Sequence, residues 1–238
     1  MENKIVNNKI IFSIETSGKV CSVALAKFNS DFDLNSELIN YELISEYSIN
    51  IGNKHDKYCA ELCKRILQDN DCEISNIDCV VVSTGPGSFT GLRIGVAVAK
   101  GICFDLNNEI PLIAVPTLSA LSNNAVPIAN LCNEASKILA IIPSHSNLVY
   151  HQFFDKKGNK ISDIELIDLQ TLAQKHIDEN LIITTNSLIK INFGIHISHL
   201  FYITASSIAR LGAKMYLNNE FTNSIDIHPL YIQDFIPK

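Results

Sequence analysis

The spacing of hydrophobic positions changes along the first half of the chain, and each change predicts an element. Residues 10–14 and 20–28 are β-rich runs joined by the tight turn "ETSGK", in which Gly18 is free to take positive φ. This pattern predicts a β-hairpin. Residues 41–49, "YELISEYSI", predict a third strand, so we expect an antiparallel meander of three strands.

Two predicted helices follow, with a strand between them. In residues 55–67 the hydrophobic positions recur at spacings of three and four and form one stripe, which predicts an amphipathic helix. The run "CVVVST" is continuously apolar, which is typical of a strand buried on both faces of a mixed or parallel sheet. Residues 91–104 then predict a second helix.

The order of elements recurs in the second half, although the residues themselves do not repeat. Strands are predicted at residues 111–115, 138–142, 149–154, 161–166 and 181–185, and helices from Thr117, at 169–177 and at 205–217. The hairpin turn "DKKGNK" joins the third and fourth of these strands. Antiparallel strands followed by helix, strand and helix in each half predict an α/β protein of two related halves, with a break near residues 107–110.

Composition and charge narrow the class of protein. The chain has 238 residues, 47% of them hydrophobic and 18% charged, with a formal net charge of −6. It can bury a substantial core, and its acidic balance disfavours RNA binding by the chain alone. No apolar run reaches the roughly 18 residues of a membrane span, and the polar N-terminal residues lead into a strand rather than forming a signal peptide. We therefore expect a cytoplasmic protein.

The cysteines predict no disulfide framework. There are seven, an odd number, without a Cys-x-x-Cys pair, and most lie in apolar segments. This pattern is typical of reduced thiols in a core.

The stretch "STGPGSFTGLRIGVAVAKG" resembles a phosphate-binding loop because glycines follow a strand and precede a helix. It does not match a Walker loop, because Gly91 is followed by Leu92 and Arg93 rather than by lysine and a hydroxyl residue. Gly85, Gly87 and Gly91 are spaced one residue too wide for the dinucleotide fingerprint. Free N–H groups at the helix start could still attract an anion.

The glycines inside this helix need an explanation of their own. Gly91, Gly95 and Ala99 recur every four residues, and only Arg93 and Lys100 are charged. An interior glycine costs about 0.5–1 kcal/mol, so close approach to a neighbouring element is expected to compensate. The helix is predicted to be buried nearly all round, either in the core of its own domain or partly by another protein chain.

Two motifs carry a resemblance to a known family. "IFSIETSGKVCSVALA" and "GPGSFTGLRIGVAVAKGI" resemble the bacterial TsaB (YeaZ) family in order and spacing, across roughly residues 9–117. The resemblance implies an actin-like, sugar-kinase-type (ASKHA) fold of two related subdomains of mixed sheet flanked by helices. They would comprise residues 1–107, completed by 205–238, and a diverged part at 108–204.

The resemblance also implies a function. Members of this family are non-catalytic partner subunits in the addition of threonylcarbamoyl to adenosine in tRNA. They support the catalytic paralogue TsaD and the ATPase TsaE, with tRNA contacted only within the complex and a homodimer formed by the isolated subunit. The implied partner surface lies on the two helices of the first half: Gly91, Arg93, Ile94, Gly95, Val98, His55, Tyr58 and Leu62.

Three positions depart from the family pattern. Glu15 replaces an aspartate, "PSH" at residues 143–145 replaces Asp-Ala-Arg, and Gln233 replaces an arginine. Fold relatives hold a nucleotide and its metal at the first hairpin, where this chain has Glu15, Thr16 and Ser17. The longer Glu15 side chain weakens this site, so no cofactor is assigned, although ATP or ADP at a subunit boundary remains open.

Two enzymatic hypotheses stay open beside the partner subunit: an ATP-binding enzyme of the same fold, and a metallopeptidase, the "glycoprotease". The catalytic paralogue holds its metal through His-x-x-x-His, and this chain has Thr117 and Leu121 there, neither a credible transition-metal ligand. His55, Cys59 and Cys63 share a helix face but extend over about 12 Å, too far for one ion. We predict no metal site.

Overall fold

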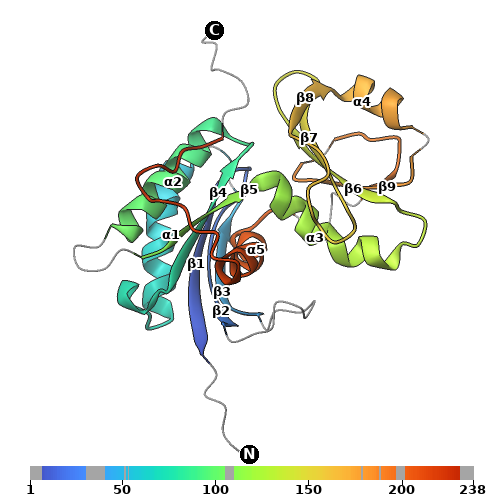
Figure 1. Cartoon of the computed structure of the whole chain (residues 1–238). Coiled ribbons are helices and arrows are strands. Elements are labelled where there is room, and N and C mark those ends of the chain that lie inside the picture. Colours follow the sequence, from blue (N-terminus) through green and yellow to red (C-terminus); the bar gives the residue numbers. More distant parts are fainter. Residues whose placement is uncertain are drawn as a thin grey trace, which may run out of the picture. The chain divides into compact units, whose positions relative to one another are not determined.

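The chain forms two units, each built around a five-stranded sheet (Figure 1). The computed structural model describes residues 7–30, 41–50, 52, 54–104, 110–177, 179–187, 189–196 and 202–230. Unit 1 comprises the residues up to Thr84, Phe89–Val115 and Thr204–Pro229, and unit 2 comprises Gly85–Ser88, Pro116–Ile203 and the residues from Leu230. The expected break near residue 107 falls at positions outside the described residues, and the main change of unit lies between Val115 and Pro116.

Unit 1 holds the predicted meander, two helices after it, and the last helix of the chain. Its elements are β1 (Asn8–Glu15), β2 (Cys21–Asn29), β3 (Tyr41–Ile49), α1 (His55–Asp69), the short 3-10 helix η1 (Ile74–Asn76), β4 (Cys79–Gly85), α2 (Phe89–Cys103), β5 (Leu112–Pro116) and α5 (Ala205–Leu217). The strand order is β3-β2-β1-β4-β5, with β1 antiparallel to β2 and parallel to β4.

Unit 2 repeats this order with different residues. Its elements are α3 (Thr117–Leu131), β6 (Lys137–Pro143), β7 (Leu148–Phe154), β8 (Glu165–Asp168), α4 (Leu169–His176), β9 (Leu181–Thr185) and β10 (Ile195–His196). The strand order β8-β7-β6-β9-β10 matches that of unit 1, again with two antiparallel pairs and then parallel pairs. The predicted relation between the two halves is therefore confirmed.

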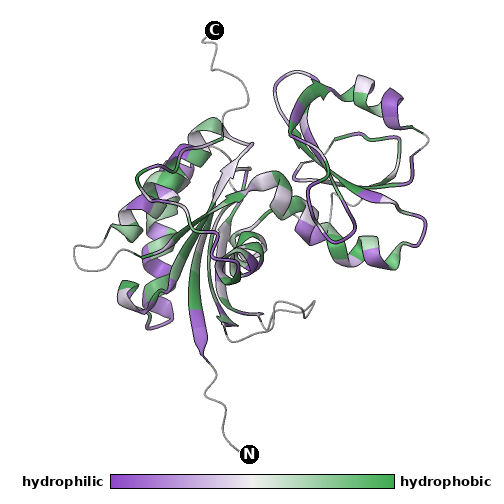
Figure 2. Ribbon diagram, viewed as in Figure 1, coloured by the Kyte–Doolittle hydropathy of each residue, from purple (hydrophilic) through white to green (hydrophobic). Residues whose placement is uncertain are grey.

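The core of unit 1 lies between its sheet and the helices on either face. α1 and α2 cover one face and α5 covers the other (Figure 1), and the central strands are hydrophobic where the helices are mixed (Figure 2). α5 lies close to the sheet at Gly212, where a Cβ would stand 2.6 Å from Val81 Cγ2. The Ser13 hydroxyl also donates a hydrogen bond to the Ala205 carbonyl, 2.9 Å away. The last helix of the chain thereby completes the first unit.

Several predictions differ from the structure. The strand expected at residues 161–166 begins only at Glu165. Before it, Lys160 forms an isolated bridge with Phe154, and the Ser162 hydroxyl oxygen accepts a hydrogen bond from the Phe153 backbone N–H in place of a strand pair. η1 and β10 were not predicted, since three and two residues are too short to show a period.

None of the described helices is long and apolar enough to cross a membrane.

The prediction for the cysteines is confirmed. All seven are free, five are buried, and the other two, Cys72 and Cys132, are half-buried.

Candidate functional site

A cluster of buried polar side chains lies where β1 ends. Glu15, Thr16, Ser17 and Ser83 are each at most 2% exposed. Because β1 and β4 are parallel with Ile14 opposite Val82, Glu15 stands beside Ser83. One carboxyl oxygen, Glu15 Oε1, accepts a hydrogen bond of 2.6 Å from the Ser17 backbone N–H. The Ser17 and Ser83 hydroxyls approach the same carboxyl without completing a hydrogen bond of good geometry.

Burial dominates the chemistry of Glu15. Desolvation raises the pKa of its carboxyl to about 7, and the contacts with Ser17 and Ser83 only partly oppose this rise. The structure thus brings the three candidate cofactor residues Glu15, Thr16 and Ser17 together. The burial of the Glu15 carboxyl, however, makes this cluster a poor binding site for a magnesium ion with its phosphate group. A hard cation needs ionised carboxylate oxygens, and burial disfavours the ionised form of this carboxyl.

Thr16 is also the residue against which α2 packs. A Cβ added at Gly95 would overlap Thr16 Oγ1 and stand 3.4 Å from Thr16 Cβ. The close approach expected for an interior glycine therefore occurs inside the chain at this position. Gly95 serves the packing of unit 1 and offers no smooth surface to another protein.

The eight predicted interface residues divide into two groups. Gly91, Gly95, His55 and Leu62 are buried within the chain. These four positions are covered by unit 1 itself, so their contact with a partner stays a prediction. Arg93 is exposed, and Ile94, Val98 and Tyr58 are half-buried at the edge of that core.

The chain by itself does not bury α2 on every side, so burial in its own domain alone is wrong, and cover by another protein chain stays a prediction. Arg93, Ala97 and Gly101 are exposed and follow one another at spacings of four, so they share one side of the helix. Phe104 stands at the end of this side and is 72% exposed. A Cβ on Gly101 would meet nothing within 4 Å. We call Arg93, Ala97, Gly101 and Phe104 the outer face of α2.

Sequence reasoning missed Ala97, Gly101 and Phe104 as candidate surface residues. A signal was present, because Ala97 and Gly101 continue the spacing of four from Arg93 and Phe104 follows three residues later. The even distribution of apolar residues around the helix concealed it.

The candidate metal ligands do not form a site. His55 is 6% exposed at the start of α1, and Cys59 and Cys63 lie in the core of unit 1. Thr117 and Leu121, at the positions expected for paired histidines, are fully buried on α3. Within the described parts of the chain, no group of three His, Cys, Asp or Glu residues could hold a metal ion.

Comparison with known proteins decides the family. A family model described as "TsaD: tRNA N6-adenosine threonylcarbamoyltransferase" matches residues 44–207, well over half of the chain. The chain belongs to this family. Within it, the predicted resemblance to TsaB (YeaZ) proteins is confirmed, since the similar curated proteins include several named TsaB.

Two of these relatives show how far the likeness extends. The tRNA threonylcarbamoyladenosine biosynthesis protein TsaB of Buchnera aphidicola subsp. Baizongia pistaciae is 31% identical, over 60% of this chain and 56% of its own length. That of Escherichia coli K12 is 30% identical, over 63% of this chain and 57% of its own. The chain thus matches little more than half the length of these members of the family.

The fold is shared more widely than the sequence. The solved structure of YeaZ from Pseudomonas aeruginosa superposes with a TM-score of 0.71 at 19% identity, covering 94% of this chain and all of that one. Together with the repeated strand order, this confirms the actin-like, two-unit α/β fold implied by the resemblance.

Proposed function

We propose that this chain is a non-catalytic partner subunit in the biosynthesis of threonylcarbamoyladenosine in tRNA. The support comes from its family and from relatives named for that pathway. In this role it binds and supports a TsaD-type catalytic paralogue and a TsaE-type ATPase in the cytoplasm, and it contacts tRNA only within the complex.

The observation that carries the proposal is the outer face of α2. Gly101 lies inside a helix, where glycine costs about 0.5–1 kcal/mol, and no described residue of the chain lies within 4 Å of the position of its absent Cβ. Phe104 adds an exposed aromatic ring to the same side. A helix of another chain can approach closely at Ala97 and Gly101 and cover Phe104, which would compensate both costs.

The same surface can serve two partners. A homodimer formed through it would be isologous and would compete with binding of the paralogue. Tyr58, Ile94 and Val98 border this surface and extend it toward α1. The non-catalytic part of the proposal rests on Thr117 and Leu121, which offer no metal-binding nitrogen where the paralogue has histidines.

The test is a Gly101→Leu variant co-expressed with the paralogue from the same genome. Bulk at this position should reduce co-purification at least about tenfold, while far-UV circular dichroism and the melting temperature stay unchanged. The matched control is Lys175→Leu, which adds the same side chain at an exposed position of α4 in unit 2. Normal pairing by Gly101→Leu would show that the outer face is not the interface.

Two assays separate this role from the enzymatic alternatives. Calorimetric titration of the isolated chain with ATP and magnesium should show no tight binding, and metal analysis should show no stoichiometric zinc. Either positive result would support the ATP-binding enzyme or the metallopeptidase instead.

A further inference from the structure

A groove in unit 2 is not used by the proposed partner function. It has a volume of about 580 Å³, which is within the range of pockets that bind small organic molecules. One wall is α4 and the other is the segment 190–193, which follows β9. Both walls carry apolar residues, Leu169 and Ala173 from α4 and Phe193 from the opposite segment.

The polar groups around the groove share one property: none is acidic. Four carboxamides and one ammonium group line it, those of Asn147, Gln170, Gln174, Asn192 and Lys190. Lys190 forms no salt bridge with any residue that the structure describes. In a chain of net charge −6, an apolar lining with an exposed lysine, and with no acidic side chain among the described residues that line the groove, is complementary to an anion with an apolar body.

Hydrogen bonds within the chain fix the position of the α4 wall in the absence of a ligand. At the start of α4, Asp168 accepts hydrogen bonds from the Gln170 and Thr171 backbone N–H groups, at 2.9 and 3.1 Å. The same carboxylate accepts one of 2.8 Å from the Asn147 side chain, which fixes that carboxamide at the groove. The Asp168 carboxylate is therefore already engaged by the helix start and by Asn147.

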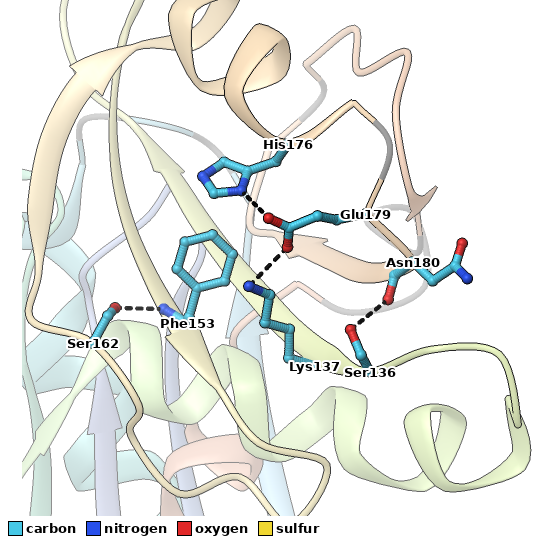
Figure 3. Close-up of polar contacts among 7 residues, drawn as sticks. All are labelled: Ser136, Lys137, Phe153, Ser162, His176, Glu179 and Asn180. Carbon is cyan, nitrogen blue, oxygen red and sulfur yellow. Dashed lines mark hydrogen bonds and ion pairs between the residues drawn. The ribbon is translucent and has the colours of Figure 1, made fainter.

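A second network fixes the other end of α4 (Figure 3). Glu179 stands between His176 and Lys137, with its two oxygens 2.8 Å from His176 Nδ1 and 2.7 Å from Lys137 Nζ. Lys137 Nζ also lies 4.5 Å from the centre of the Phe153 ring. On the opposite wall Phe193 is 5% exposed and packs in the core of unit 2. Both walls thus rest on buried structure, and a ligand would pay little ordering cost.

We propose that this groove binds a small organic anion with an apolar body, such as an aromatic carboxylate or sulfonate. The apolar part lies on Leu169, Ala173 and Phe193, the charge pairs with Lys190, and the carboxamides donate hydrogen bonds to the anionic head. This site does not include the outer face of α2, so failure of this proposal would leave the proposed partner function unaffected, and the reverse also holds.

The test uses three probes on the full chain. Anilinonaphthalene sulfonate combines an apolar body with an anion, phenylnaphthylamine has the body alone, and inorganic phosphate has the charge alone. We expect fluorescence titration to show saturable binding of the first, weaker binding of the second, and none of phosphate by calorimetry. Amide chemical shift changes should centre on α4 and residues 190–193.

Charge variants then test the assignment to this groove. Lys190→Glu and the isosteric Gln174→Glu should each weaken binding of the sulfonate probe about fivefold to tenfold and leave phenylnaphthylamine unaffected. Lys157→Glu is the matched control, because it makes the same charge change at an exposed position of unit 2 outside the groove. Equal effects of Lys190→Glu and Lys157→Glu, or shift changes centred on another part of the chain, would overturn the proposal.

Discussion

Gly95 and Gly101 lie on the same helix and look alike in the sequence, but the structure gives them different roles. Gly95 faces inward, and its missing side chain leaves room for Thr16 of the same chain. Gly101 faces outward, with no atom near the position of its absent Cβ. A glycine in a helix can therefore allow close packing within its own chain or leave an open position on the surface, and only the residues around it distinguish the two roles.

The greatest loss of stability is expected from a large side chain at Gly95, on the inner side of α2. Gly95→Leu should destabilise the chain by about 3 kcal/mol or more, because the new atoms overlap Thr16 in a fully packed layer. Urea unfolding measures this change. Gly101→Leu is the control and should leave the free energy of unfolding within about 1 kcal/mol of the parent. Equal losses in the two variants would mean that both glycines face the core.

The buried carboxyl beneath this side of α2 gives the next largest effect. Because the pKa of Glu15 is raised from 4.5 to about 7, its contribution to stability is fully present below about pH 4.5 and is lost as pH rises to about 7. The loss is on the order of 3 kcal/mol. Glu15→Gln cannot ionise, so its free energy of unfolding should change less between pH 5 and pH 8. The same pH dependence in both proteins would show that another group titrates.

Alanine substitutions at the two glycines test the same difference with a smaller change in side-chain volume. Gly101→Ala should stabilise the chain by about 0.5–1 kcal/mol, since alanine favours the helix and meets no neighbour. Gly95→Ala should have the opposite sign, and adding Thr16→Ala to it should recover part of the loss. Thr16→Ala alone completes the cycle, and thermal unfolding of these four variants and the parent measures both signs and the coupling between positions 16 and 95.

The smallest expected effect on stability is at Phe104. Phe104→Ser should change the free energy of unfolding by less than about 0.5 kcal/mol, because the ring is 72% exposed. It should nevertheless weaken self-association in sedimentation velocity if the outer face of α2 is the homodimer surface. Phe221→Ser, at another exposed aromatic residue of unit 1, controls for a general loss of hydrophobic surface.

Much of the fold followed from the sequence, and most of the candidate site did not. β3, β9 and α5 begin and end where their periodicity predicted, because a strand or helix with one buried face repeats its apolar residues regularly. The interface residues came from the family resemblance, and half of them are covered by the chain's own packing, so their contact with a partner stays a prediction. The groove in unit 2 gave no sequence signal at all, because its residues come from three separate segments.

The α/β class, the repeated order of elements, the absence of a disulfide framework and the family could all be read from the sequence, because each depends on local periodicity or on a contiguous motif. The packing of Gly95 on Thr16, the burial of the Glu15 carboxyl, and the outward position of Gly101 and Phe104 required the folded chain. The physical reason is that the burial of a residue depends on contacts between segments distant in the chain. When a helix has apolar residues on every side, its sequence does not show which side the sheet will cover.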